Sequence, residues 1–228
     1  MEIAVTNTPN YGSEEVAQMV FAHLLEITNS VALHSQSVKD GDWNRSLDFC
    51  YWNRTMISLK GKTMGLIGYG NIGKATGKIA EAFGMKVIVH SATHKEGVQN
   101  VTLDELYKES DVISLHCPLT DTTERMIDKK ALSKMRNGVI IINTSRGPLI
   151  VEEDLAEAVR NGKVLGAGLD VLSVEPPKED NILIHTPGVN VTPHIAWAAK
   201  EARENLLNIA VDNLKAFMKG EKKNRVEL

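Results

Sequence analysis

Residues 63–73 read Thr-Met-Gly-Leu-Ile-Gly-Tyr-Gly-Asn-Ile-Gly, an apolar run that leads through three glycines into a helical pattern. Apolar side chains then recur at helical spacing from Ile72 to Phe83, and Gly84 follows as a helix-ending residue. This order predicts a buried strand, a tight glycine turn and a helix in direct succession.

Such a turn is suited to the pyrophosphate of a dinucleotide. Gly68 allows the sharp bend, Gly70 lets the backbone approach the phosphates, and Gly73 lets helix and strand pack closely. The helix N-terminus adds unpaired N–H groups and the positive end of the helix dipole. The pattern therefore predicts a dinucleotide cofactor site rather than an ordinary glycine-rich loop.

The second predicted strand, residues 86–90, ends without an acidic residue. In an NAD-binding unit, an acid roughly 20 residues after the glycines binds the 2′-hydroxyl of the adenosine ribose. This chain has Ser91 at that place, and Lys95 follows in the next turn. A serine can bind a hydroxyl or accommodate a phosphate, and Lys95 is either a phosphate contact or a solvated loop charge. The sequence therefore leaves both NAD and NADP open as the cofactor.

Composition argues against several classes of partner. The chain has 228 residues and a formal net charge of -3, and its basic residues are dispersed, so we expect no nucleic-acid partner. Cys50 and Cys117 lie far apart and the histidines lack metal-ligand spacing, so we predict neither a disulfide nor a metal site. No apolar run has membrane-spanning length and no signal-peptide pattern is present, so we expect no membrane partner and a cytoplasmic protein.

From the glycine turn onward, strand and helix patterns alternate along the chain. This alternation predicts an α/β protein with a doubly wound parallel sheet, that is, a Rossmann-type dinucleotide-binding domain. The β-branched, all-apolar strands are typical of a sheet that is covered on both faces. The predicted strands span 63–67, 86–90, 112–116, 139–143, 164–169 and 189–192.

Capping signals mark several helix ends. Thr102 and Glu105 form a capping box at the start of a short helix, and Gly138 and Gly162 are expected directly after helix ends. The last helix, from about residue 199 to 219, is long and amphipathic, so its apolar face must pack on something.

The first sixty residues have a different pattern. Residues 3–5 are expected to form a short strand, and Ser13 to cap a long helix that carries His23 among apolar residues, in a core or an interface. Residues 41–57 form a loop rich in Trp, Tyr and Phe, which either packs under a lid or contacts a second subunit. The flanking arginines favour the subunit contact, because interfaces are enriched in Trp, Tyr and Arg.

Three side chains of complementary chemistry follow successive predicted strands. Arg146, Glu175 and His194 come to the carboxyl edge of the sheet, where ligands of open α/β sheets bind. Reduction of a 2-keto acid needs a proton for the carbonyl oxygen and a cation for the substrate carboxylate. His194 can give the proton, Glu175 can orient and charge the imidazole, and Arg146 can supply fixed donors. Singly, these residues suggest a structural ion pair and a loop histidine; together they favour catalysis.

Several motifs resemble, in order and spacing, those of the D-isomer-specific 2-hydroxyacid dehydrogenases. They are Gly-Tyr-Gly-Asn-Ile-Gly at 68–73, His-Cys-Pro-Leu at 116–119, Asn-Thr-Ser-Arg-Gly-Pro at 143–148, the segment 170–177, and Pro-His at 193–194. The resemblance covers nearly the whole chain. It implies hydride transfer between a nicotinamide cofactor and a small D-2-hydroxy or 2-keto acid. Within the family, segments 52–54 and 194–203 are most similar to glycerate dehydrogenase (hydroxypyruvate reductase).

The resemblance also implies roles for individual residues. Arg146 would bind substrate, Glu175 would support the acid–base, and His194 would be the acid–base. The cofactor would contact Gly68, Gly70, Asn71, Ile72, Gly73, Ser91, Cys117, Pro118, Thr144, Ser145, Asp170 and Ala196.

Parts of the cofactor are assigned by the same resemblance. The pyrophosphate would meet the N–H groups of Asn71 and Ile72, and the adenosine ribose would meet Ser91. The adenine would lie beside Cys117 and Pro118. The nicotinamide carboxamide would lie by Thr144 and Asp170.

The resemblance implies an unusual domain organisation. An amino-terminal domain precedes the cofactor domain in the family, and roughly a hundred residues of it are expected to be missing here. Residues 1–12 would be a remnant of this second, substrate domain, 13–198 the dinucleotide-binding domain, and 199–228 a helix that packs back on the substrate domain. The family dimerises through its cofactor domain, which agrees with a homodimer interface formed by residues 13–57. Two alternatives stay open, a non-catalytic NAD(P)-binding sensor or partner-binding module, and an inactive fragment of a dehydrogenase.

Overall fold

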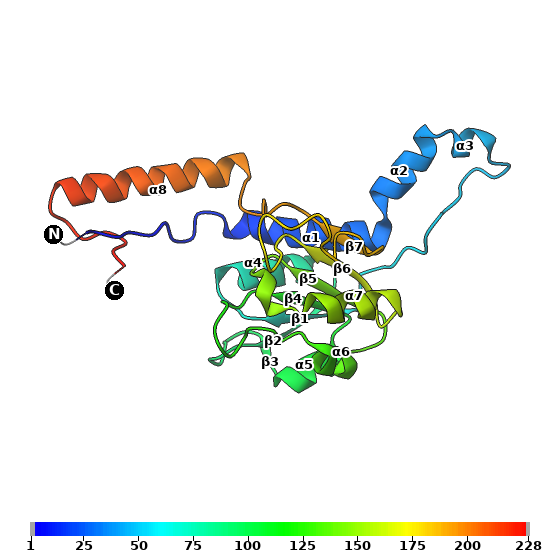
Figure 1. Ribbon diagram of the computed structural model, residues 1–228, viewed down its shortest axis with the longest axis horizontal. Helices are drawn as coiled ribbons and strands as arrows, with labels where there is room; N and C mark the ends of the chain where they lie inside the picture. Colours follow the sequence, from blue (N-terminus) through cyan, green and yellow to red (C-terminus); the bar gives the residue numbers. More distant parts are fainter. Residues whose placement is uncertain (1–2, 227–228) are drawn as a thin grey trace.

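The computed structural model describes residues 3–226. The first two residues of the predicted segment 1–12 and the last two of the predicted segment 199–228 lie outside the described residues. Within residues 3–226, seven strands form one parallel sheet in the order β3-β2-β1-β4-β5-β6-β7 (Figure 1). They are β1 (Thr63–Ile67), β2 (Lys86–His90), β3 (Gln99–Asn100), β4 (Val112–Leu115), β5 (Val139–Asn143), β6 (Val164–Leu169) and β7 (Val189–Val191). The predicted doubly wound α/β fold is confirmed.

The strand predictions differ from the structure only at the margins. β4 and β7 each end one residue before the predicted end, and the two-residue β3 is too short and polar to show strand periodicity. The strand order changes direction between β1 and β4, and ligands bind beside this switch point in doubly wound sheets.

Helices cover both faces of the sheet, and each face has its own buried apolar cluster. One cluster joins β1, β4 and β5 to α1 (Ser13–Asn29) and α4 (Asn71–Ala82). The other joins the sheet to α5 (Leu103–Glu109), α6 (Lys129–Lys134) and α7 (Glu152–Arg160). All four residues of β4 and all five of β5 are buried, which explains why these strands read as continuous apolar runs.

Two of the predicted capping roles need correction. Ser13 is the first residue of α1 and not its cap; Gly12 precedes the helix, and the cap makes no side-chain hydrogen bond. Gly138 follows no helix end, because α6 already ends at Lys134; it adopts a φ of +76° in the turn before β5. The capping box of Thr102 and Glu105 is confirmed, and Gly162 does follow α7.

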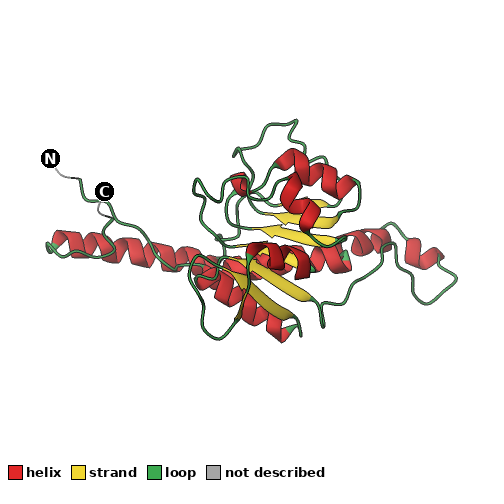
Figure 2. Cartoon of the chain, turned by 90° about the horizontal axis from the view of Figure 1, so that it is seen from below, coloured by secondary structure: helices red, strands yellow, loops and turns green. Residues whose placement is uncertain are grey.

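Two parts of the chain project from the sheet in opposite directions (Figure 2). On one side, α2 (Val31–Lys39) and α3 (Asp42–Arg45) continue from α1. On the other, α8 (Lys200–Met218) lies beside residues 3–12. In the described part of the chain no single helix is long and apolar enough to cross a membrane, and only α1 and α2, bent by 57° from each other, pass that test as a pair.

The expected strand at residues 3–5 is absent. The segment 3–12 lies away from the sheet, and among the described residues it forms one isolated antiparallel bridge, between Thr6 and Arg225. Side chains of α8 hold the segment: Asn213 Nδ2 donates to Asn7 O at 2.8 Å and Asn205 Nδ2 to Tyr11 O at 3.1 Å. A strand needs a ladder of partners, which one bridge does not provide.

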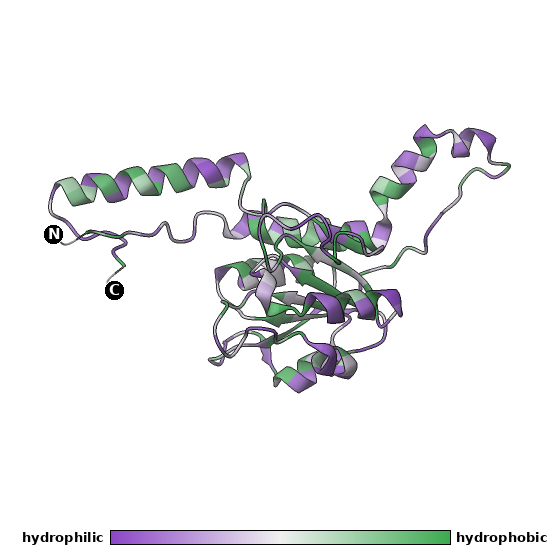
Figure 3. Cartoon of the chain, in the orientation of Figure 1, coloured by the Kyte–Doolittle hydropathy of each residue, from purple (hydrophilic) through white to green (hydrophobic). Residues whose placement is uncertain are grey.

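The projecting helix α8 keeps much of its apolar surface exposed. Figure 3 shows hydrophobic and hydrophilic residues alternating along its length. The large exposed apolar side chains are Leu207, Val211, Leu214, Phe217 and Met218. The expectation that this face packs on a further domain stays a prediction.

Candidate active site

The three glycines of the turn are required for different physical reasons. Gly68 has a φ of +95°, and a Cβ there would lie 2.6 Å from the backbone of His116. A Cβ on Gly73 would lie 2.5 Å from Gly68 O, so the helix could not pack on the turn. A Cβ on Gly70 would meet nothing within 4 Å. Folding therefore accounts for Gly68 and Gly73, whereas Gly70 leaves the backbone accessible from outside, as a closely bound ligand requires.

The turn delivers the N-terminus of α4 to an open cavity of about 260 Å³. Gly70 precedes the helix, and no side chain caps it. The N–H groups of the first turn therefore keep their capacity to bind an anion. The cavity is lined by Asn10, Tyr11, Gly12, Ser13, Val16, Gly70, Asn71, Ile72, Gly73, His116 and Trp197. These features fit a dinucleotide pyrophosphate.

Several residues of this cavity were not identified from the sequence. Asn10, with a φ of +56°, accepts a hydrogen bond of 2.5 Å from Asn71 Nδ2 and so joins the segment before α1 to the glycine turn. Burial lowers the pKa of His116 to about 4, so this histidine is neutral at physiological pH and brings no charge to a bound phosphate. Asn10 is 61 residues from Asn71, and no local pattern relates the two.

Ser91 follows β2 directly beside the glycine turn. The N–H of Gly68 donates to His90 O at 2.8 Å, which fixes the two strand ends next to each other. Ser91 is partly exposed, and Lys95 Nζ donates to Thr93 Oγ1 at 2.8 Å. The end of β2 therefore presents a hydroxyl where an NAD-type unit presents a carboxylate.

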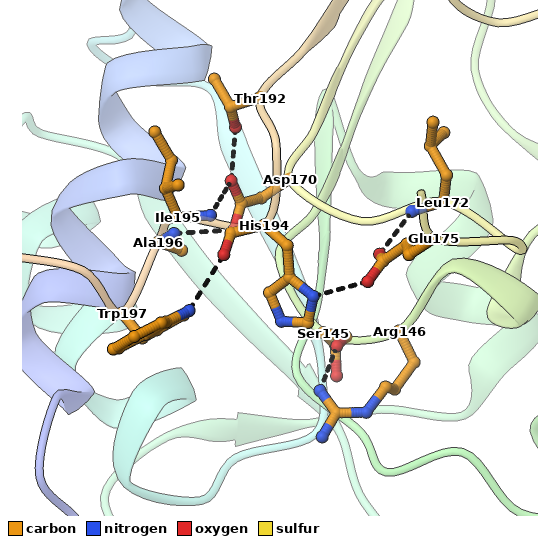
Figure 4. A network of polar contacts seen from close by, with 10 residues as sticks. All are labelled: Ser145, Arg146, Asp170, Leu172, Glu175, Thr192, His194, Ile195, Ala196 and Trp197. Carbon is orange, nitrogen blue, oxygen red and sulfur yellow. Dashed lines mark hydrogen bonds and ion pairs between the residues drawn. The ribbon is translucent and has the colours of Figure 1, made fainter. Parts of the chain in front are cut away.

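His194 and Glu175 form a pair at the carboxyl edge of the sheet (Figure 4). His194 Nδ1 lies 2.7 Å from Glu175 Oε2, while Glu175 Oε1 accepts a 2.9 Å hydrogen bond from Leu172 N. Partial burial works to raise the pKa of the Glu175 carboxyl, but the hydrogen bonds from His194 and Leu172 and the nearby charge of Arg146 lower it overall. Glu175 is thus a charged partner that holds the imidazole ring of His194 in place through Nδ1.

Arg146 lies below this pair in Figure 4, on the segment that leaves β5. Its Nη1 donates to Ser145 O at 2.6 Å, and its own carbonyl accepts from Asn143 Nδ2 at 2.8 Å. Among the described residues, the ion pair of Glu175 is formed with His194 and not with Arg146. The exposed guanidinium therefore keeps donors for a substrate carboxylate.

Asp170 is fully buried and fixes the segment that carries His194. Its Oδ1 accepts from Thr192 Oγ1 at 2.5 Å and from Ile195 N at 3.0 Å, and its Oδ2 accepts from Ala196 N at 2.7 Å. His194 has a φ of +54°, a conformation that side chains other than glycine adopt only when their surroundings hold it. The contact of Asp170 with the nicotinamide carboxamide stays a prediction, whereas Asp170 does hydrogen-bond directly to the backbone that follows His194.

The remaining predicted cofactor residues line the same edge. Ser145 Oγ donates to Cys117 O at 2.7 Å and ties the ends of β5 and β4 together. Burial raises the pKa of the Cys117 thiol, and the exposed Pro118 follows it. Thr144 Oγ1 is buried without a hydrogen-bond partner among the described residues, and such atoms are rare unless a ligand or water satisfies them.

The indole of Trp197 connects the two halves of the site. Trp197 lines the cavity at the glycine turn, and its Nε1 donates to His194 O at 2.9 Å. This hydrogen bond joins one wall of the cavity to the segment that carries His194. Such a site can combine hydride transfer with proton transfer at one carbonyl group.

Comparison with known proteins agrees with this geometry. Residues 21–196 match the family model of the NAD-binding domain of D-isomer-specific 2-hydroxyacid dehydrogenases. A hydroxypyruvate reductase of Blautia hydrogenotrophica is 51% identical over 98% of this chain and 71% of its own length. A glycerate dehydrogenase of Methylorubrum extorquens is 42% identical, over 99% of this chain and 72% of the relative.

Solved structures with the same fold include enzymes in complex with a nicotinamide dinucleotide. The TT0316 protein of Thermus thermophilus has a TM-score of 0.90 and 39% identity, over 99% of this chain and 72% of that one. A D-lactate dehydrogenase of Lactobacillus jensenii, solved with NAD+, has a TM-score of 0.86 and 31% identity. An acyclic imino acid reductase, solved with NADPH, has a TM-score of 0.88 and 36% identity. Each of these two matches covers 99% of this chain and 72% of the other chain. This chain therefore belongs to the D-isomer-specific 2-hydroxyacid dehydrogenases, whose nicotinamide dinucleotide it is built to bind.

Proposed function

We propose that the protein interconverts a short 2-keto acid and its D-2-hydroxy acid, with hydroxypyruvate and glycerate as the substrate pair. The observation that carries this proposal is the 2.7 Å contact of His194 Nδ1 and Glu175 Oε2 at the carboxyl edge of the sheet. The names of the two relatives, a hydroxypyruvate reductase and a glycerate dehydrogenase, support the choice of substrate.

A bound nicotinamide supplies or accepts the hydride in this reaction. During reduction, the protonated His194 gives the proton on Nε2 to the substrate carbonyl oxygen. Glu175 keeps the ring oriented through Nδ1 and stabilises its positive charge. Arg146 binds the substrate carboxylate and polarises the carbonyl. During oxidation, neutral His194 takes the proton back.

Replacing Arg146 with lysine tests the substrate site. We expect hydroxypyruvate-dependent oxidation of NADH to fall roughly 100-fold or more, because an ammonium keeps the charge but cannot form two parallel hydrogen bonds to a carboxylate. Steady-state kinetics should show the loss in kcat/KM, and NADH affinity should stay within about twofold of the starting protein, since the pyrophosphate turn is untouched.

Arg136 offers a matched control for this substitution. It is also on the surface, and its guanidinium contacts Asp111 and Glu109 O away from the carboxyl edge. Arg136→Lys should leave turnover unchanged. Equal losses in the two variants would contradict the assignment of Arg146 to the substrate.

The coenzyme preference is expected to depend on Ser91. We propose that both NAD and NADP bind, with affinities within about a factor of ten, because no carboxylate repels a 2′-phosphate. Ser91→Asp should shift the ratio toward NAD by roughly tenfold or more through charge repulsion. Fluorescence titrations with both reduced dinucleotides measure the ratio. A strong NAD preference that the aspartate does not change would contradict this role.

We also propose that the α1–α3 region and the following aromatic loop form a homodimer interface. Trp43, Phe49 and Trp52 are 52%, 89% and 65% exposed, and Trp43, Tyr51 and Trp52 help to line an apolar hollow of about 560 Å³. So large an exposed apolar surface is typical of a protein contact.

The combined variant Trp43→Ala/Trp52→Ala tests this interface. Buried tryptophan anchors contribute on the order of 2 kcal/mol or more each, so the dimer dissociation constant should rise roughly a thousandfold. Sedimentation equilibrium at micromolar concentration measures it. If the unsubstituted protein is already monomeric at micromolar concentration, these side chains do not form a homodimer interface.

We keep the cytoplasm as the proposed location. Both cysteines are free thiols, with Cys50 exposed and Cys117 buried. A reducing compartment maintains this state.

A further inference from the structure

A buried histidine on α1 connects to the catalytic segment. His23 is 4% exposed, and its Nε2 lies 3.1 Å from Thr192 Oγ1. Gly168 in β6 makes room for the ring, because a Cβ there would lie 2.4 Å from the Cβ of His23. Because Gly168 has no side chain, the ring of His23 packs directly against β6, and this close packing restricts the imidazole to one position.

The direction of each hydrogen bond follows from the donors available. Asp170 accepts the only hydroxyl proton of Thr192, so this hydroxyl cannot also donate to His23. His23 must therefore carry a proton on Nε2 and donate it to Thr192 Oγ1. Burial lowers the pKa of His23, although the charge of Asp170 works in the opposite direction, so the donor is a neutral imidazole.

The hydrogen-bond path from His23 through Thr192 and Asp170 ends at the backbone next to His194. Asp170 accepts the N–H groups of Ile195 and Ala196, the two residues after His194. His194 itself is in the left-handed region at a φ of +54°, so its backbone depends on such neighbouring restraints.

We infer that His23 is a positioning residue for catalysis, which acts through Thr192 and Asp170 to hold the acid–base His194 in its working geometry. The inference rests on the proposed function for the role of His194. The hydrogen-bond path itself is independent of any reaction. A network that is fully satisfied holds its members in one arrangement, and the loss of one donor loosens the rest.

Four variants separate this role from general packing. His23→Leu removes the donor and keeps an apolar side chain, whereas His23→Gln keeps an N–H donor at the same reach as Nε2. Thr192→Val breaks the next contact in the path. Thr28→Val is the packing control, because Thr28 is fully buried on the same helix and, among the described residues, the hydrogen bonds of its hydroxyl all stay within α1.

Amide hydrogen exchange of Ile195 and Ala196, measured by NMR on the 228-residue chain, reports the network without any need for turnover. We expect exchange to accelerate roughly fivefold to tenfold in His23→Leu and Thr192→Val, as the loss of one net hydrogen bond predicts. His23→Gln and Thr28→Val should retain protection. The amide of Ala167, which bonds to Gly188 O in the sheet, should be unchanged in every variant.

Kinetics then test the link to catalysis. His23→Leu should lower kcat by about the same factor with KM for the keto acid unchanged, and His23→Gln should restore it. The inference is overturned if Ile195 and Ala196 exchange at the original rate in folded His23→Leu, or if Thr28→Val accelerates them equally. If His23→Leu does not fold, exchange in Thr192→Val decides between the same two outcomes. A chain that shows no turnover in any variant contradicts the proposed function, and the exchange data still judge the network.

Discussion

Replacing His194 with alanine is expected to lower the reduction of a 2-keto acid by roughly 100-fold to 10,000-fold, the range that a positioned general acid contributes. The imidazole is the group that Glu175 holds at 2.7 Å, and a methyl group cannot replace its proton. Dinucleotide affinity should remain nearly intact, because the pyrophosphate turn lies on a different loop. Stopped-flow measurement of NADH oxidation and a fluorescence titration of NADH binding separate these two effects.

The pH dependence of the two reaction directions is a second test of the role of His194 as the acid–base. Reduction needs the protonated imidazole and should decline as pH rises, whereas oxidation of the hydroxy acid needs the neutral ring and should increase. Although burial opposes it, the hydrogen bonds to Glu175 lower the pKa of its carboxyl, so the carboxylate stays charged across both profiles. Glu175→Gln removes this charge and the acceptor for Nδ1, and it should lower the rate of reduction by a smaller factor than His194→Ala does.

His90 offers a control on the same sheet. It is the last residue of β2, and its Nδ1 contacts Val101 O rather than a carboxylate. His90→Ala should leave the pH profiles unchanged. Reduction of hydroxypyruvate at the original rate by His194→Ala would show that His194 is not the acid–base of the reaction.

Replacing Gly70 with valine is expected to weaken dinucleotide binding by roughly 100-fold or more without loss of stability. The φ of Gly70 is −78°, which any residue adopts, and a Cβ there meets nothing within 4 Å of the protein itself. The side chain would instead occupy the space from which a pyrophosphate approaches the backbone. Loss of two charge-assisted hydrogen bonds of about 1.5 kcal/mol each corresponds to that factor.

Gly68→Val provides the contrast for this prediction. At a φ of +95° and 2.6 Å from the His116 backbone, a side chain there conflicts with the fold itself. This variant should lose thermal stability, whereas Gly70→Val should melt at the original temperature. Calorimetry together with titration distinguishes them. Tight dinucleotide binding by Gly70→Val would contradict the assignment of the glycine turn to the cofactor site.

Local signals in the sequence were sufficient for most elements and insufficient at some ends. The capping box at Thr102 is a pattern of four residues, and the structure contains it as predicted. Ser13 and Gly138 carried similar signals but do not cap helices, because α1 begins and α6 ends where packing permits and not where a favourable residue occurs. Residues 3–5 have strand composition but lack a strand beside them.

The sequence by itself determined the parallel sheet, the glycine turn and the arrival of Arg146, Glu175 and His194 at one edge. All of these follow from periodicity and from the rule that parallel strands bring their carboxyl ends together. The tertiary structure alone decided that Glu175 pairs with His194, and that His23 reaches Thr192 over a separation of 169 residues. Hydrogen bonds of this kind depend on how helices pack across the sheet, and such packing leaves no periodic trace in the chain.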